Sequence, residues 1–194
     1  MLTGLKTDLK RGLLFTLATM VLFGGVYHGV VWAIGRIFPS QAEGSLIRRP
    51  DGSIIGSSLI AQNFARPEYF HSRPSGVDYN AASTGGTNYG PSNPDHLKAV
   101  RERLDAALAS ENVGAAQVPS EMITAGGGGL DPHLPPRALD IQVQRVARAR
   151  GIDASRIRNL LASHIEPPTF GIFGRERANV LELNLALDET FGKK

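Results

Sequence analysis

The sequence contains no cysteine, which excludes disulfide cross-links and thiolate metal sites. It also lacks a large excess of either charge, because the formal net charge of its 194 residues is only +3. Three of the 21 basic residues, Lys6, Lys10 and Arg11, precede the first apolar run, and from Arg36 onward 18 Lys and Arg stand against 17 Asp and Glu. This near-neutral balance indicates no broad phosphate-binding face, so we expect no nucleic-acid partner.

Charged residues are also absent from residues 12–35, a run of 24 mostly apolar residues. As a helix rising about 1.5 Å per residue, this run is roughly 36 Å long, enough to cross a hydrocarbon core of about 30 Å. A cleaved secretory signal is the alternative, but its apolar segment is typically only about 7–15 residues long. The run therefore predicts a transmembrane helix over 12–35, between an N-terminal segment, 1–11, and a single domain, 36–194.

The flanking charges predict the orientation of this helix. Lys6, Lys10 and Arg11 cluster at its start, whereas the basic residues that follow Arg36 are more widely spaced. Because basic residues favour the cytoplasmic side, the pattern predicts a cytoplasmic N-terminus and a periplasmic domain outside the inner membrane.

Small residues recur within the predicted helix. Gly25, Gly29 and Ala33 lie four residues apart, so they form one smooth ridge, here called the small-residue ridge. Such a ridge lets a second membrane helix approach closely. The alternative is that glycine is simply frequent in membrane helices.

The domain after this helix is predicted to be α+β, with mixed helices and strands. Two short β-rich runs flank the turn tripeptide Pro50-Asp51-Gly52, which predicts a hairpin. Residues 63–93 are rich in Gly, Pro, Ser and Asn and predict a long loop, whose five aromatic side chains argue against disorder.

Further elements are predicted from capping signals and periodicity. Asn93 followed by Pro94 predicts a helix to about residue 110. Helices are also expected over 135–151 and 153–164, and strands over 121–125 and 179–187. The last strand rests on leucines that alternate at every second position, although Leu, Glu and Ala there also favour helix.

Few residues predict chemistry. The run Gly126 to Gly129 resembles a phosphate loop, but no Lys-Ser/Thr follows it, so a structural turn or a close approach by another chain is favoured. Asp131 and His133 have no partners at ligand spacing among the other histidines, and no nucleophile stands in a recognisable constellation. We therefore predict no catalytic residue and no metal site.

A cluster of arginines has two interpretations. Its members are Arg145, Arg148, Arg150, Arg156 and Arg158. The cluster can hold an anionic lipid headgroup, a nucleotide phosphate or an acidic partner surface, or it is simply a solvated helix face.

Several segments, in this order, carry a resemblance: Phe64-Ala-Arg-Pro-Glu-Tyr-Phe70 with Ser72-Arg-Pro74, Ser83-Thr-Gly-Gly-Thr-Asn-Tyr-Gly-Pro-Ser-Asn-Pro94, Ile123-Thr-Ala-Gly-Gly-Gly-Gly-Leu-Asp-Pro-His133, Gln142-Val-Gln-Arg-Val-Ala-Arg-Ala-Arg-Gly151 and Asn179-Val-Leu-Glu-Leu-Asn184. Behind a single N-terminal apolar run, they resemble the C subunit of the Kdp-type potassium-transporting P-type ATPase. The resemblance covers essentially the whole chain.

The resemblance implies an accessory subunit of an ATP-driven potassium import complex in the bacterial cell membrane. Its implied partners are a channel-like potassium-binding subunit, a P-type ATPase subunit, a small accessory membrane subunit and the lipid bilayer. The P-type motif Asp-Lys-Thr-Gly is missing here, which agrees with phosphorylation on the partner. The family is described as a catalytic chaperone that raises the ATP affinity of the P-type subunit. No cofactor is expected on this chain, and ATP is expected only through the complex.

The resemblance assigns a nucleotide contact to Gln142, whereas the predicted topology places that residue across the bilayer from cytoplasmic ATP. We expect the outer domain to cap the potassium entrance through ordered loops. The candidate subunit-contact residues are Gly85, Gly86, Asn88, Gly90, Asn93, Gly127, Gly129, Asp131 and His133. A membrane-anchored periplasmic ligand-binding or hydrolase domain is the alternative function.

Overall fold

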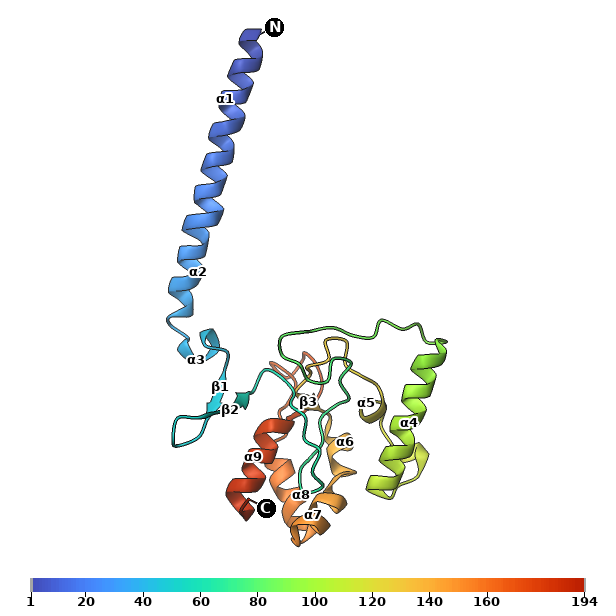
Figure 1. Cartoon of the computed structure of the whole chain (residues 1–194). Coiled ribbons are helices and arrows are strands. Elements are labelled where there is room, and N and C mark those ends of the chain that lie inside the picture. The colour runs from blue at the N-terminus through green and yellow to red at the C-terminus, as the bar shows by residue number, and fades with distance from the viewer. Residues whose placement is uncertain (1, 194) are drawn as a thin grey trace. The chain divides into compact units, whose positions relative to one another are not determined.

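A computed structural model of the chain describes residues 2–193. These residues form two compact units that divide after Leu46. The first unit is one continuous helix followed by a single short turn of helix (Figure 1). The continuous helix comprises α1 (Leu2–Thr19), a π-helical stretch η1 (Met20–Tyr27) and α2 (His28–Gly35), and α3 (Pro39–Ala42) follows it.

The long helix confirms the sequence prediction of an apolar helix and begins earlier than expected, at Leu2. Residues 4–35 are long and apolar enough to cross a membrane, with a mean hydropathy of 1.7 over the most apolar window. None of that window is buried by the rest of the chain. An apolar helix without a covering surface requires a lipid or protein environment.

The second unit is α+β, as predicted, and helices dominate it. Its strands form two small sheets: β1 (Leu46–Arg48) with β2 (Ile54–Ser57), and β3 (His133–Leu134) with β4 (Ala178–Asn179). The β3–β4 pair is antiparallel, with His133 opposite Asn179. Its helical elements are α4 (Pro94–Glu111), η2 (Ala115–Gln117), α5 (Ser120–Ile123), α6 (Pro136–Asp140), α7 (Val143–Arg150), α8 (Ala154–Ser163) and α9 (Val180–Phe191).

Local signals placed several of these elements correctly. The β1–β2 hairpin turns where predicted, because the Asp51 carboxylate accepts the Ser53 N–H at 2.8 Å and Gly52 takes a φ of +84°. Asn93 caps α4 by accepting the N–H groups of Asp95 and His96. Residues 58–92 contain no helix or strand, as the predicted long loop requires.

Two predicted strands are wrong. Residues 121–125 were expected to be extended, but α5 begins there after Pro119, and the Thr124 N–H bonds the Ser120 carbonyl at 2.8 Å. Residues 179–187 lie mostly in α9, because the Asn179 side chain accepts the N–H groups of Leu181 and Glu182 and so starts a helix. The alternating leucines concealed a helical set of buried residues: Val180, Leu181, Leu183, Asn184 and Leu187.

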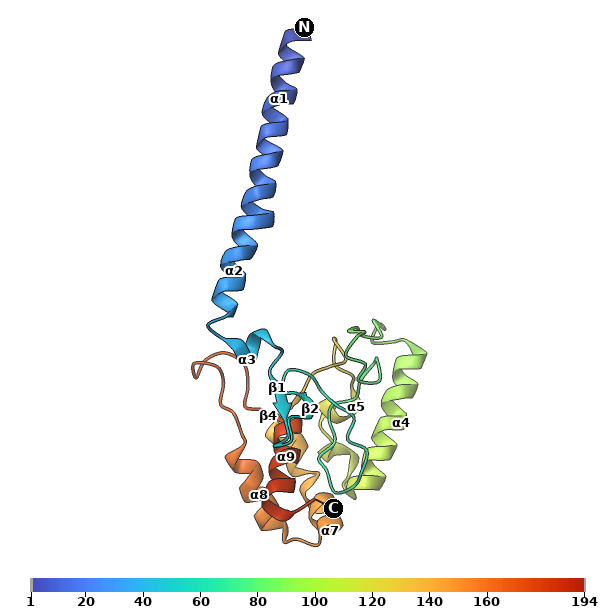
Figure 2. The ribbon, with the colours of Figure 1, turned by 60° about the vertical axis from the view of Figure 1, so that its left-hand side comes forward.

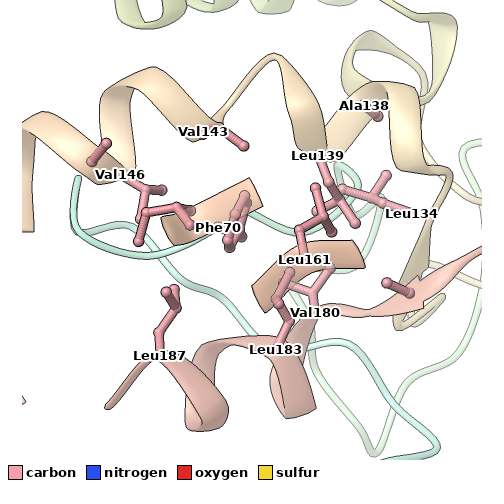
Figure 3. Packing of buried hydrophobic residues seen from close by; sticks show 13 residues of the cluster. Phe70, Leu134, Ala138, Leu139, Val143, Val146, Leu161, Val180, Leu183 and Leu187 are labelled. Carbon is pink, nitrogen blue, oxygen red and sulfur yellow. The ribbon is translucent and has the colours of Figure 1, made fainter. Parts of the chain in front are cut away.

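The predicted helix over 135–151 is interrupted. α6 ends at Asp140 and α7 begins at Val143, with Gln142 between them. Both helices nevertheless bury apolar side chains in the core, as predicted. Figure 3 shows Phe70, from the long loop, surrounded by side chains of α6 to α9. Phe70 is fully buried, so the long loop is anchored at the centre of the helical layer.

Candidate functional site

The small-residue ridge lies on the exposed first helix. Gly25, Gly29 and Ala33 are all solvent-exposed, and a Cβ added at Gly25 or Gly29 would meet nothing within 4 Å. The ridge is therefore open to a neighbouring helix. Its role in packing stays a prediction.

The two glycine-rich loops of the second unit pack on each other. The Gly85 N–H donates to the Gly128 carbonyl at 3.1 Å, and a Cβ at Gly86 would lie 2.7 Å from the Gly127 carbonyl oxygen. Gly129 has a φ of +69°, and a Cβ there would lie 3.0 Å from the Gly85 carbonyl oxygen. The glycines therefore serve first to bring these two loops together.

The remaining candidate contact residues follow these paired loops in the sequence. The Asp131 carboxylate lies 3.5 Å from the Arg73 guanidinium and accepts the His133 N–H at 3.0 Å. Asn88 has a φ of +52° and is exposed, as is Gly90. Contact of these residues with another subunit stays a prediction. Among the described residues, no three His, Asp or Glu side chains are grouped to hold a metal.

Replacement of Gly86 by alanine tests this packing. We expect Gly86→Ala to destabilise the second unit by about 1–3 kcal/mol, because the methyl group would overlap a backbone oxygen that cannot move freely. Gly90→Ala is the matched control, since nothing lies within 4 Å of a Cβ at that position. Thermal unfolding of the full chain in detergent, followed by near-UV circular dichroism, measures the difference. Equal midpoints for the two variants would contradict the prediction.

Gln142 and Asn184 hold the backbone of the long loop. The Asn184 side chain accepts the Phe70 N–H at 2.8 Å and donates to the Phe70 carbonyl at 2.9 Å. The Gln142 side chain accepts the His71 N–H at 2.7 Å and donates to the His71 carbonyl at 3.3 Å. We call these two side chains the amide clamp. Both are 1% exposed, and together they bind consecutive residues of the loop as a neighbouring strand would.

The side-chain amide of Gln142 has further partners. Its oxygen also accepts from Arg145 Nη2 at 2.8 Å, and its nitrogen also donates to the Ala138 carbonyl at 3.2 Å. Both hydrogens and both acceptor directions of the amide are therefore used within the chain. The same residue borders a cavity of about 380 Å³, lined in part by Tyr79 and Arg103. A ligand in that cavity would have to displace one of these bonds to reach Gln142.

Arg145 extends the same network. Its Nε lies 2.8 Å from the Glu111 carboxylate, and its Nη1 donates to the carbonyls of Pro67 and Tyr69 at 2.7 and 2.8 Å. The side chains of Arg145 and Glu111 are 8% and 2% exposed. A buried charge is tolerated when it is paired and hydrogen-bonded. Arg145 meets both conditions, whereas Glu111 is paired through Oε1 and its Oε2 has no hydrogen-bond partner among the described residues.

Arg150 fixes the preceding part of the loop. Its Nε donates to the Glu68 carbonyl at 2.8 Å, its Nη2 contacts the Asp188 carboxylate at 2.7 Å, and its guanidinium lies 5.0 Å from the Tyr69 ring centroid. Tyr69 in turn donates its hydroxyl to Asp188 at 2.8 Å. Burial, followed by the bond to Asp188, raises the pKa of Tyr69, which keeps this donor protonated.

These contacts correct both interpretations of the arginine cluster for two of its five members, Arg145 and Arg150. Arg145 and Arg150 are buried and consumed by internal bonds, so they form neither a solvated face nor an anion site. Arg148, Arg156 and Arg158 are exposed, as the solvated-face interpretation predicts, and Arg158 pairs with Asp140 at 2.8 Å. Burial, with the neighbouring Arg145 charge, lowers the pKa of His71, so its ring is neutral at pH 7 beside the amide clamp.

The sequence comparisons match this chain over nearly its whole length. The family described as "K+-transporting ATPase, c chain" matches residues 9–189. The chain belongs to this family. A potassium-transporting ATPase KdpC subunit of Shewanella putrefaciens is 49% identical over 183 residues, which cover 92% of this chain and 89% of the relative. The corresponding subunits of Geobacter sulfurreducens and Polaromonas naphthalenivorans are 44% and 45% identical and cover 93% and 95% of this chain, and 97% and 95% of their own lengths. The resemblance to the C subunit is confirmed.

The resemblance to the C-chain family singled out Gln142, but the sequence analysis missed the residues that form the same buried hydrogen-bond network. Asn184, Glu111 and Asp188 were not considered, and Arg145 and Arg150 were assigned to the surface. The available signals were a polar Asn within the apolar repeat of α9 and arginines on the apolar face of α7. Both place polar groups at positions where a helix faces the core.

Proposed function

We propose that this chain is the accessory subunit that assembles and stabilises a potassium-transporting P-type ATPase in the bacterial inner membrane. Its partners are the channel-like potassium-binding subunit, the P-type subunit and a small accessory membrane subunit. The observation that carries the proposal is the apolar helix over residues 4–35, none of whose most apolar window is buried by the chain itself. Membership in the C-chain family supports the choice of complex.

In this proposal the helix packs beside the channel-like subunit, with the small-residue ridge at the contact. The N-terminus lies in the cytoplasm, and the second unit lies outside the membrane and caps the potassium entrance. The positive charges before residue 12 support this orientation. The paired glycine-rich loops support docking, because their interlocked backbones present an ordered surface.

The chain binds no cofactor of its own and acts on ATP through its partners. A rise in the ATP affinity of the P-type subunit follows from the assembled state of the complex in this proposal. The bonding of Gln142 supports an indirect route, because its amide is already used within the chain.

The double variant Gly25→Leu with Gly29→Leu tests the proposal. Leucine would fill the open ridge and separate the helices, so we expect several-fold less channel-like subunit to co-purify with the tagged chain. Val26→Leu with Val30→Leu is the control, because both valines are already large and exposed. Recovery of an intact complex from the glycine variant would exclude the ridge as the contact.

A further inference from the structure

The arm between α8 and β4 ends in three exposed apolar side chains. Phe170, Ile172 and Phe173 are 87%, 76% and 66% exposed, although they lie within four residues of one another. Figure 2 shows this arm leaving the helical layer after α8 before it returns to β4. Single exposed apolar residues are common on proteins, whereas a concentrated group marks an interaction site. We call these three residues the apolar tip.

Backbone hydrogen bonds hold the arm in a defined shape. Glu166 and Arg177 exchange N–H···O bonds of 2.7 and 3.1 Å at its base. Thr169 and Phe173 exchange bonds of 2.8 and 2.9 Å near the tip, and the N–H groups of Gly171 and Ile172 bond within the turn. Polar backbone groups paired in this way can enter weakly polar surroundings without losing their partners. Because these backbone groups are already bonded within the turn, few of them are free to pair with a strand of another chain.

Charges stop at the base of the arm. Residues 167–174 contain no charged side chain. The base carries two acidic and two basic residues, Glu166, Glu176, Arg175 and Arg177, and Arg177 pairs with Glu166 at 3.1 Å. The arm therefore has an apolar end and a polar, neutral base. This division suits shallow insertion, in which the tip enters the acyl boundary while the base remains at the headgroups.

The chain itself limits how far the second unit can lie from a membrane. Eleven Cα–Cα steps lead from Gly35, the end of α2, to Leu46, the start of β1. At about 3.3–3.6 Å per residue they span at most about 40 Å when fully extended. A bilayer that holds the long helix is therefore always within reach of the second unit. This tether favours lipid as the surface that the tip meets.

We propose that the apolar tip inserts into the lipid interface of the same membrane that holds the N-terminal helix. Insertion gives the second unit a second attachment point beside its covalent tether. The inference goes beyond assembly of the complex and rests only on the proposed membrane anchoring. It does not require anionic lipid, because the arm has no net charge.

Site-directed fluorescence tests this insertion directly, because the natural chain has no cysteine. Full-length chain carrying Ile172→Cys is labelled with a polarity-sensitive fluorophore and reconstituted into phosphatidylcholine vesicles. We expect blue-shifted emission and several-fold stronger quenching by acyl-chain nitroxide lipids than for the same probe at Ala109→Cys or Asn159→Cys. Both control positions are exposed on helices of the second unit. Adding phosphatidylglycerol should change the quenching little.

A second variant tests whether the apolar character of the tip is responsible. Phe170→Asp in the Ile172→Cys chain should remove the blue shift and the lipid quenching. The substitution leaves the turn intact, because residue 170 has a φ of +55° and aspartate adopts that conformation more readily than phenylalanine. Vesicle flotation of each labelled chain checks the anchor separately, so a failed anchor is distinguished from a failed insertion.

Two results would overturn the inference. One is water-like emission from a probe at residue 172 although flotation shows that the chain is bound to the vesicles. The other is a probe that is shielded in the reconstituted complex but not quenched by lipid nitroxides, since this would show docking on a protein partner.

Discussion

Arg145→Met is expected to reduce the free energy of unfolding of the second unit by about 3–5 kcal/mol, because it leaves the Glu111 carboxylate buried without its cation. In the described part of the chain, Glu111 Oε2 already lacks a hydrogen-bond partner, and without Arg145 Nε at 2.8 Å the Oε1 atom would keep the Ser110 hydroxyl at 3.3 Å. The substitution also removes the donors to the carbonyls of Pro67 and Tyr69. Thermal unfolding of the full chain in detergent, followed by the near-UV signal of its tyrosines, measures the loss.

The matched control for this substitution is Arg148→Met on the same helix. Arg148 is exposed, and its Nε donates to the Gln144 carbonyl of its own helix at 3.3 Å. Its replacement should change stability by less than about 0.5 kcal/mol. A second control adds Glu111→Gln to Arg145→Met and should recover part of the loss, because the buried charge is then gone. Equal effects of the two arginine substitutions would show that the buried pair contributes nothing.

The same pair shows what the sequence could not predict. Charge and helical spacing are visible in residues 143–150, but three of the residues that Arg145 bonds, Glu111, Pro67 and Tyr69, lie 34 to 78 residues away. A solvated face and a buried network give the same local pattern of arginines. Burial is decided by which segment packs on the helix, and local periodicity does not contain that information.

Elements with local signals were predicted well. Asn93 and Asp153 cap α4 and α8 with their own side chains, so the sequence contains the cause of each helix start. The last helix, α9, was harder to predict from the sequence. Its leucines at alternate positions favour a strand, whereas the cap at Asn179 favours a helix. The apolar run over residues 12–35 was the easiest feature, since its length alone implies a helix.

The candidate site was predicted only in outline. The glycine-rich loops and Gln142 were selected through the family resemblance, and the contacts assigned to them stay predictions. Their arrangement depends on contacts between residues 73–90, residues 124–131 and the core helices, all far apart in the sequence. No periodic signal links such segments, so the pairing of Gly86 with Gly127 and the amide clamp emerged only from the fold.

Gln142→Ala is expected to destabilise the second unit by about 2–4 kcal/mol and to leave the ATP affinity of each assembled complex unchanged. The loss has two physical sources. The substitution leaves the buried His71 N–H and Arg145 Nη2 without their acceptor, and it opens a small cavity between α6 and α7. Gln144→Ala is the control, because Gln144 is exposed and lies two residues further on, in the first turn of α7. Unfolding midpoints of the two variants measure the difference.

The second half of this prediction separates a structural role from a nucleotide contact. Potassium-stimulated ATPase activity is measured on complexes reconstituted with wild-type chain, Gln142→Ala or Gln144→Ala, at matched recovery of all subunits. If Gln142 has a purely structural role, Gln142→Ala lowers the yield of complex. The ATP concentration at half-maximal rate then equals that of wild type, since the surviving complexes contain a folded chain. A contact between Gln142 and ATP predicts the opposite: a raised half-maximal concentration at full recovery. Because all the donors and acceptors of the Gln142 amide are already bonded within the chain, we expect the first result.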